Sequence, residues 1–292
     1  MKDCTGATMS AGHINMQDPQ TVISGIEEMA IEAGNVILAI RSKGITRTDK
    51  QDGSPVTEAD MAADQLIRDR LAQLAPGITA ITEESWEAAE QQGEPEQYWC
   101  VDPLDGTKGF INGGSDFTVN IALIRNRCPR LGVIYAPALG CLWAADGKKA
   151  WRRSARPAAD HSLASLGTAT RILARPAKLE KPRVVATRAH RTAALEDWLQ
   201  RIDPSEAVAV GSSLKFCTIA EGKADLYPRI GPTMEWDTAA GQSIVETAGG
   251  TMVSSGGAPF LYGKPGRLNG YFTVTAKLAG PVPVNWLPPL QE

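Results

Sequence analysis

A sharp change from apolar to acidic residues near the middle of the chain constrains its fold and its chemistry most strongly. The apolar residues 98–101 predict a short buried strand, and Asp102-Pro103 ends it, because proline lacks the backbone N–H that a sheet ladder needs. Asp105, Gly106 and Thr107 follow in one turn, so two carboxylates lie near a hydroxyl and a flexible glycine. Such oxygen ligands suit Mg²⁺. The same residues are also typical of a polar turn whose aspartates cap a helix.

The composition bounds the class of protein. The 292 residues are 43% hydrophobic and 22% charged, which is ordinary for a globular chain with a sizeable core. A net charge of −3 lacks the basic excess that binding to duplex nucleic acid needs. No apolar run reaches the roughly 18 residues of a membrane span, and the polar N-terminus does not resemble a secretory signal. We expect no duplex nucleic acid partner and no membrane span.

The cysteines and histidines bound the location and the metal chemistry. The 5 cysteines and 3 histidines are dispersed, and no C-x-x-C pair occurs, so a zinc site is not expected. This usage fits a reducing cytosol, and we predict a cytoplasmic protein. Any association with a membrane would be peripheral, on the cytoplasmic face of the inner membrane.

Two amphipathic helices are predicted in the first half of the chain. Apolar residues recur at helical spacing over residues 18–41 and 58–74. A short strand over residues 78–81 then runs into Glu83, which is either a surface charge or a metal ligand. Asp60 lies in the first turn of the second helix, where an acidic residue commonly complements the helix dipole and does nothing more.

Strands dominate the stretch after the acidic turn. They are predicted over residues 117–124, 131–136, 141–145 and 150–151, which favours an antiparallel meander. Residues 152–182 are rich in Arg, Pro, Ala and Ser, with a short strand near residues 170–173, and this change of character marks a domain boundary.

The second half of the chain alternates strands and helices, which predicts an α/β domain. The alternating segments are residues 184–187, 192–202, 207–210, 214–220 and 224–227. Asp237 lies at the start of a further helix, whose small residues permit close packing. We predict three parts: a flexible N-terminal tail over residues 1–17, an α+β domain over 18–181, and an α/β domain over 182–292.

Three motifs occur in a fixed order along the chain. They are Thr82-Glu83-Glu84-Ser85, Asp102-Pro103-Leu104-Asp105-Gly106-Thr107 and Trp236-Asp237-Thr238-Ala239-Ala240-Gly241. Together they resemble the inositol monophosphatase superfamily of Mg²⁺-dependent, lithium-sensitive phosphomonoesterases, and the order and spacing agree from about Asp18 to Phe272. The resemblance implies a layered α-β-α-β-α sandwich, with an antiparallel sheet in the N-terminal half and an α/β C-terminal half.

Within this superfamily the chain is most similar to the bacterial bisphosphate nucleotidases. The similarity rests on residues 53–57, 117–124, 211–217 and 226–229. Gly109 departs from the pattern, because the bacterial members usually carry Glu at this position. The eukaryotic bisphosphate nucleotidases can have Gly there, so the departure affects the subgroup more than the activity.

The resemblance implies a magnesium cluster and a catalytic hydroxyl. Two or three Mg²⁺ ions would bind the phosphate and stabilise the leaving oxygen, and Li⁺ would inhibit. Thr107, paired with Asp60, would orient or deprotonate the attacking water, and Glu83 would share in catalysis. The metal ligands would be Glu83, Asp102, the carbonyl of Leu104, Asp105 and Asp237, with Asp60 reaching a more weakly held ion.

A bisphosphate substrate also needs a second anion site. The backbone N–H groups of Gly106 and Thr107 would hold the reacting phosphate at the start of a helix. The candidates for the remaining substrate contacts lie in the second half of the chain, mostly near strand ends. The basic side chains among them could equally form a solvated surface. These candidates are Arg188, His190, Ser212, Ser213, Lys215, Arg229 and Asp237.

The activity that the resemblance implies is hydrolysis of adenosine 3',5'-bisphosphate to AMP and phosphate. 3'-Phosphoadenylyl sulfate is a second expected substrate. One alternative is an inositol or sugar phosphate phosphatase on the same scaffold, and another is a non-catalytic nucleotide- or metal-binding module. The expected partner is a small bisphosphorylated nucleotide, and both a monomer and a homodimer remain open.

Overall fold

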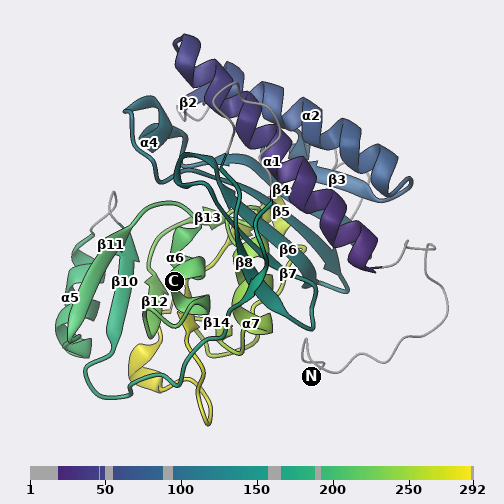
Figure 1. Ribbon diagram of the computed structural model, residues 1–292. Helices are drawn as coiled ribbons and strands as arrows, with labels where there is room; N and C mark the ends of the chain where they lie inside the picture. Colours follow the sequence, from purple (N-terminus) through teal and green to yellow (C-terminus); the bar gives the residue numbers. More distant parts are fainter. Residues whose placement is uncertain are drawn as a thin grey trace.

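Five layers make up the protein (Figure 1). The computed structural model describes residues 19–45, 47–49, 55–87, 95–156, 166–187 and 192–290, and the predicted tail over residues 1–17 lies outside them. Two helices cover one face of a large sheet, two more lie between this sheet and a smaller one, and a last helix covers the outer side of the smaller sheet. The predicted α-β-α-β-α sandwich is confirmed.

The first layer contains α1 (Pro19–Lys43) and α2 (Glu58–Leu74). Their apolar stripes are buried against the large sheet, as the helical spacing of residues such as Ile26 and Ile67 predicts. Thr57 begins α2 with a capping box, in which its hydroxyl oxygen accepts from the N–H of Ala59 and the side chain of Asp60 accepts from the N–H of Thr57. The strands β1 (Arg47–Asp49) and β2 (Pro55–Thr57) form a small hairpin ahead of α2.

The large sheet has seven strands in sequence order. Its β3 and β4 are parallel and the later neighbours are antiparallel, as the predicted meander requires. Its central strands are apolar on both faces because helices cover both. The strands are β3 (Thr79–Thr82), β4 (Gln97–Asp105), β5 (Thr118–Arg125), β6 (Cys128–Ala136), β7 (Cys141–Ala145), β8 (Ala150–Ser154) and β9 (Thr170–Arg171).

The prediction that the central strand stops at Asp102-Pro103 is wrong. Asp102 pairs with Asn120, and the ladder resumes where Asp105 pairs with Thr118, with an irregularity between the two pairs. Pro103 has no N–H to contribute, so the strand bulges around it instead of ending. The bulge lets both acidic residues remain on the sheet while the chain between them bends.

The middle layer contains α6 (Leu214–Ala220) and α7 (Ala239–Thr247). The helix α7 begins at Ala239, so the predicted start at Asp237 is two residues too early. Gly241 allows the two helices to pack closely, because a Cβ at this position would overlap the ring of Phe216. The predicted role of small residues in close packing is therefore seen at Gly241.

The smaller sheet has the strand order β11-β10-β12-β16-β14. The strands β11, β10 and β12 are parallel to one another, and β16 pairs antiparallel with both β12 and β14. Sequence reasoning missed β14 and β16, which follow α7. The strands are β10 (Arg183–Thr187), β11 (Glu206–Val210), β12 (Leu226–Arg229), β14 (Thr251–Ser254) and β16 (Phe272–Thr275).

The outer layer is α5 (Ala193–Ile202), which Thr192 caps through its hydroxyl. Its Trp198 is buried with Trp286 under the smaller sheet. The remaining short elements are α4 (Thr107–Ile111), η1 (Pro137–Leu139), β13 (Thr233–Met234), η2 (Pro265–Arg267), β15 (Leu268–Asn269) and η3 (Val284–Trp286).

The two halves of the chain share one apolar core. Residues of the large sheet such as Ile134 belong to the same buried cluster as Phe216 of α6 and Phe272 of the smaller sheet. The division into domains at residues 181 and 182 stays a prediction. Among the residues that the structure describes, no helix is long and apolar enough to cross a membrane.

Glu246 makes the stability of this core depend on pH. Burial raises the pKa of the Glu246 carboxyl to about 7, although Gln242 donates to it at 2.9 Å. When folding raises the pKa of an acid, the folded protein loses stability as the pH rises from the pKa of the unfolded state through the pKa of the folded state.

We expect Glu246→Gln to stabilise the protein by on the order of 2 kcal/mol more at pH 8 than at pH 5, because the amide never ionises. Urea unfolding of both proteins at the two pH values measures the difference. The exposed Glu180→Gln serves as control and should show no such dependence. An equal effect of Glu246→Gln at both pH values would contradict this assignment.

Candidate active site

A pocket of about 530 Å³ lies where β4 ends and the two halves of the chain meet. Its walls come from the end of β4, from α4 and the loop after it, and from the strand ends and turns of the second half. Among the residues that line it are Glu83, Asp102, Leu104, Asp105, Gly106, Thr107, Ser212, Ser213, Lys215, Arg229 and Asp237. These are eleven of the residues that the sequence predicts for the site.

Three carboxylates converge in this pocket. Asp102, Asp105 and Asp237 each offer one oxygen, and these oxygens lie within 4.8 Å of one another. Each carboxylate also accepts a hydrogen bond from a backbone N–H: Asp102 from Leu104 at 3.0 Å, Asp105 from Ser213 at 2.7 Å and Asp237 from Met234 at 2.8 Å. The backbone therefore orients all three side chains.

The proximity of these carboxylates perturbs their protonation. Burial, together with the charges of Glu83, Asp105 and Asp237, raises the pKa of Asp102 well above its ordinary value. Burial and the charges of Asp105 and Glu83 raise the pKa of Asp237 to about 7. Buried like charges repel one another unless a cation lies between them. Hard carboxylate oxygens in this arrangement fit a divalent cation such as Mg²⁺.

Glu83 and Leu104 complete the predicted ligand set along the same wall. Glu83 follows β3, and its N–H donates to the carbonyl of Val101 at 3.1 Å, which fixes the turn beside β4. Its side chain lines the pocket, and its charge acts on both Asp102 and Asp237. The carbonyl oxygen of Leu104 lies 3.0 Å from the hydroxyl oxygen of Thr107.

Asp60 lies behind Thr107 and is 3% exposed. One of its carboxylate oxygens accepts from the N–H and the hydroxyl of Thr57, and the other lies 3.0 Å from the hydroxyl oxygen of Thr107. Asp60 therefore takes part in the capping box of α2 and also contacts Thr107, while its role in catalysis and in metal binding stays a prediction. Burial raises its pKa, while the hydrogen bonds from Thr57 and Thr107 oppose that shift.

Gly106 sets the position of Thr107. Its φ of +95° is left-handed, and a Cβ here would lie 2.9 Å from the carbonyl oxygen of Asp116. Glycine is required on both counts. The chain then turns directly into α4, so that Thr107 occupies the first helical position. The predicted phosphate contacts of the N–H groups of Gly106 and Thr107 stay predictions.

The second half of the chain contributes two cationic side chains to the pocket, those of Lys215 and Arg229. Lys215 is 6% exposed, and its ammonium group donates to the carbonyl of Ser212 and lies 5.5 Å from the centre of the Tyr227 ring. Burial lowers its pKa to about 8 against the attraction of Asp105. The guanidinium of Arg229 donates to the carbonyls of Gly231 and Pro232 at the pocket wall. Arg188 and His190 lie outside the described residues.

Sequence reasoning missed Asp116 and Tyr227 as pocket residues. Asp116 accepts from the N–H of Gly211 at 3.1 Å, which joins the loop after α4 to the second half. The run Gly113-Gly114-Ser115-Asp116 before the next strand was a usable signal, since glycine-rich loops with one acidic residue often line sites.

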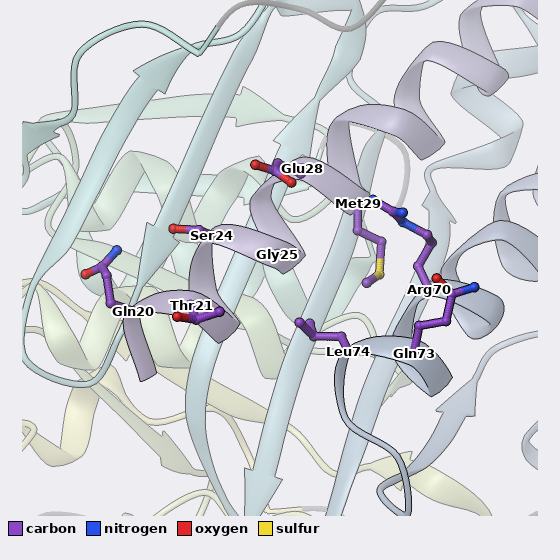
Figure 2. Close-up of a pocket in the computed structure, with 9 residues that line it drawn as sticks. All are labelled: Gln20, Thr21, Ser24, Gly25, Glu28, Met29, Arg70, Gln73 and Leu74. Carbon is purple, nitrogen blue, oxygen red and sulfur yellow. The ribbon is translucent and has the colours of Figure 1, made fainter. Parts of the chain in front are cut away.

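A second hollow, of about 580 Å³, lies between α1 and α2 (Figure 2). Within the described parts of the chain it shares no lining residue with the acidic pocket. Its charged side chains are Glu28 and Arg70, and Arg70 pairs with Glu32 at 2.9 Å. None of the residues predicted for function lines this hollow, so the acidic pocket is the candidate active site.

Comparison with known proteins finds relatives over most of the chain. The chain is 40% identical over 237 residues to the 3'(2'),5'-bisphosphate nucleotidase CysQ of Escherichia coli (strain K12), covering 80% of this chain and 91% of that protein. The crystal structure of CysQ from Bacteroides thetaiotaomicron, described as a bacterial member of the inositol monophosphatase family, matches with a TM-score of 0.75 and 35% identity over 88% of this chain and 98% of that one.

A more distant structure shows the same fold. The inositol monophosphatase of Zymomonas mobilis matches with a TM-score of 0.71 at 23% identity, over 89% of this chain and 94% of that one. Residues 18–278, which are most of the sequence, match the family described as "Inositol monophosphatase family". The chain therefore belongs to the inositol monophosphatase family.

Proposed function

We propose that this chain is a metal-dependent 3'(2'),5'-bisphosphate nucleotidase that hydrolyses adenosine 3',5'-bisphosphate to AMP and phosphate. Members of its family are metal-dependent phosphatases. The observation that carries the proposal is one pocket with two kinds of wall, since three converging carboxylates face the same space as Lys215 and Arg229. The relatives named CysQ, at about 40% identity over most of the chain, support the same substrate class.

The proposed cation site consists of the triad with Glu83 and the carbonyl of Leu104. Magnesium ions, when bound there, would supply positive charge that offsets the charge of the phosphate and favours loss of a proton from the attacking water. The residues of the chain then have to hold the phosphate in line and to accept one proton. Backbone hydrogen bonds already hold the three aspartates in place, so little reorganisation is needed when substrate binds.

Thr107 and Asp60 form the proposed proton acceptor. The single hydroxyl proton of Thr107 points toward Asp60 or the carbonyl of Leu104, each with its oxygen 3.0 Å away. The lone pairs of the Thr107 oxygen therefore remain able to accept a hydrogen bond from water in the pocket. Asp60, whose pKa burial raises, can take up the proton that Thr107 passes on.

Lys215 and Arg229 make up the proposed second anion site. Both line the pocket, and both belong to the second half of the chain. A substrate with one phosphate would occupy the acidic wall alone, whereas a bisphosphorylated nucleotide would use both. We propose 3'-phosphoadenylyl sulfate as a second substrate because it shares the 3'-phosphate. Inhibition by Li⁺, the cytoplasmic location and the oligomeric state stay predictions.

Initial rates of phosphate release test the activity. With Mg²⁺, we expect kcat/KM for adenosine 3',5'-bisphosphate to exceed that for inositol 1-phosphate by about tenfold or more, because one charge-assisted hydrogen bond is worth about 1.5–3 kcal/mol. EDTA should abolish the rate and Li⁺ should lower it. Asp237→Asn, which should still show a cooperative melting curve, serves as the inactive control.

A higher kcat/KM for inositol 1-phosphate than for adenosine 3',5'-bisphosphate would indicate an inositol or sugar phosphate phosphatase instead. Release of no phosphate from any substrate in the presence of Mg²⁺ would favour a non-catalytic binding module instead.

The role of Thr107 has its own test. Thr107→Val keeps the shape and removes the hydroxyl, and we expect kcat to fall by about 10² or more with little change in KM, since a positioned proton acceptor contributes this much. Thr107→Ser retains the hydroxyl and should keep kcat within about tenfold of the wild type. Steady-state kinetics at saturating Mg²⁺ measures both, and equal rates for the valine and wild-type proteins would remove Thr107 from the mechanism.

A further inference from the structure

A turn from the second half of the chain holds one of the three aspartates. One carboxylate oxygen of Asp105, Oδ2, accepts from the hydroxyl of Ser212 at 2.5 Å and from the N–H of Ser213 at 2.7 Å. Asp105 belongs to the large sheet, whereas the two serines immediately precede α6. The contact therefore crosses between the two halves, and it uses the same oxygen twice.

The hydroxyl of Ser212 belongs to a cluster of hydroxyl groups, and within it Ser212 donates to Oδ2 of Asp105. The hydroxyl oxygen of Thr118 lies 2.6 Å from that of Ser212 and 2.8 Å from that of Ser213, and the hydroxyl of Ser213 donates to Oδ1 of Asn120 at 2.8 Å. A hydroxyl has one proton, so Ser212 has none left for a phosphate oxygen, which only accepts, while it donates to Asp105.

The backbone of this turn is held as firmly as the side chains. Ser212 has a φ of +52°, a left-handed conformation that is uncommon for a residue other than glycine. Its carbonyl accepts from the ammonium of Lys215, and the N–H of the preceding Gly211 donates to Asp116 at 3.1 Å. Contacts on both sides of Ser212 therefore keep its hydroxyl aimed at Asp105.

We propose that Ser212 is a positioning residue that fixes one oxygen of Asp105 and thereby presents the other oxygen to the cation. The inference deepens the proposed function and rests on it, and it differs from the substrate contact that the sequence suggested for Ser212. Residues that orient a metal ligand typically contribute 10- to 100-fold in metal affinity. The turn over residues 211–213 is thus part of the cation site, although it offers no ligand of its own.

Binding of Mg²⁺ to the purified protein, measured by isothermal titration calorimetry, tests the proposal without turnover. We expect Ser212→Ala to weaken Mg²⁺ binding by about tenfold or more. At saturating Mg²⁺, its KM for adenosine 3',5'-bisphosphate should stay within about twofold of the wild type, because the proton of this hydroxyl is donated to Asp105. Ser213→Ala is the matched control, since its backbone N–H still donates to Asp105, and it should keep the Mg²⁺ affinity of the wild type.

Ser212→Gly repeats the test with a residue that accepts the left-handed backbone, and it should show the same loss of Mg²⁺ affinity even if the alanine variant is unstable. Unchanged Mg²⁺ affinity with a raised KM would overturn the proposal and return Ser212 to the substrate. That result would leave the nucleotidase assignment intact. Failure of the wild type to bind Mg²⁺ or to release phosphate would instead contradict the proposed function itself.

Discussion

Repulsion between buried carboxylates is the interaction on which the rest of the structure depends. The fold brings carboxylate oxygens of Asp102, Asp105 and Asp237 within 4.8 Å of one another, and burial together with the neighbouring carboxylates raises the pKa of Asp102 and of Asp237. Such an arrangement costs folding free energy, which either protonation or a bound cation offsets. This cost supports the proposed cation site.

The layers explain how so costly a cluster is held in place. The bulge around Pro103 keeps Asp102 and Asp105 on a sheet that is packed on both faces, while the turn before α7 carries Asp237 from the second half. The cations Lys215 and Arg229 of the same pocket come from the second half as well. The proposed metal ligands and the proposed second anion site thus meet because the two halves share a core.

Many of the helices and strands could be predicted from the sequence, because helical spacing and apolar runs indicate which faces are buried. The layers and the convergence of the acidic motifs are expected from the resemblance to the inositol monophosphatase superfamily. The continuation of β4 through Pro103 could not be predicted, because a bulge depends on the partner strand. The hold of Ser212 on Asp105 depends on a left-handed backbone and a contact across 107 residues, which no local pattern encodes.

The central claim is that the three aspartates share a cation, and a crystal structure with Mn²⁺ in place of Mg²⁺ tests it most directly. Anomalous scattering locates this ion without reference to the protein atoms. The account predicts at least one anomalous peak about 2.1 Å from carboxylate oxygens of Asp102, Asp105 and Asp237. Crystals saturated with Mn²⁺ that show no peak between these residues, or peaks only at other surfaces, would contradict it.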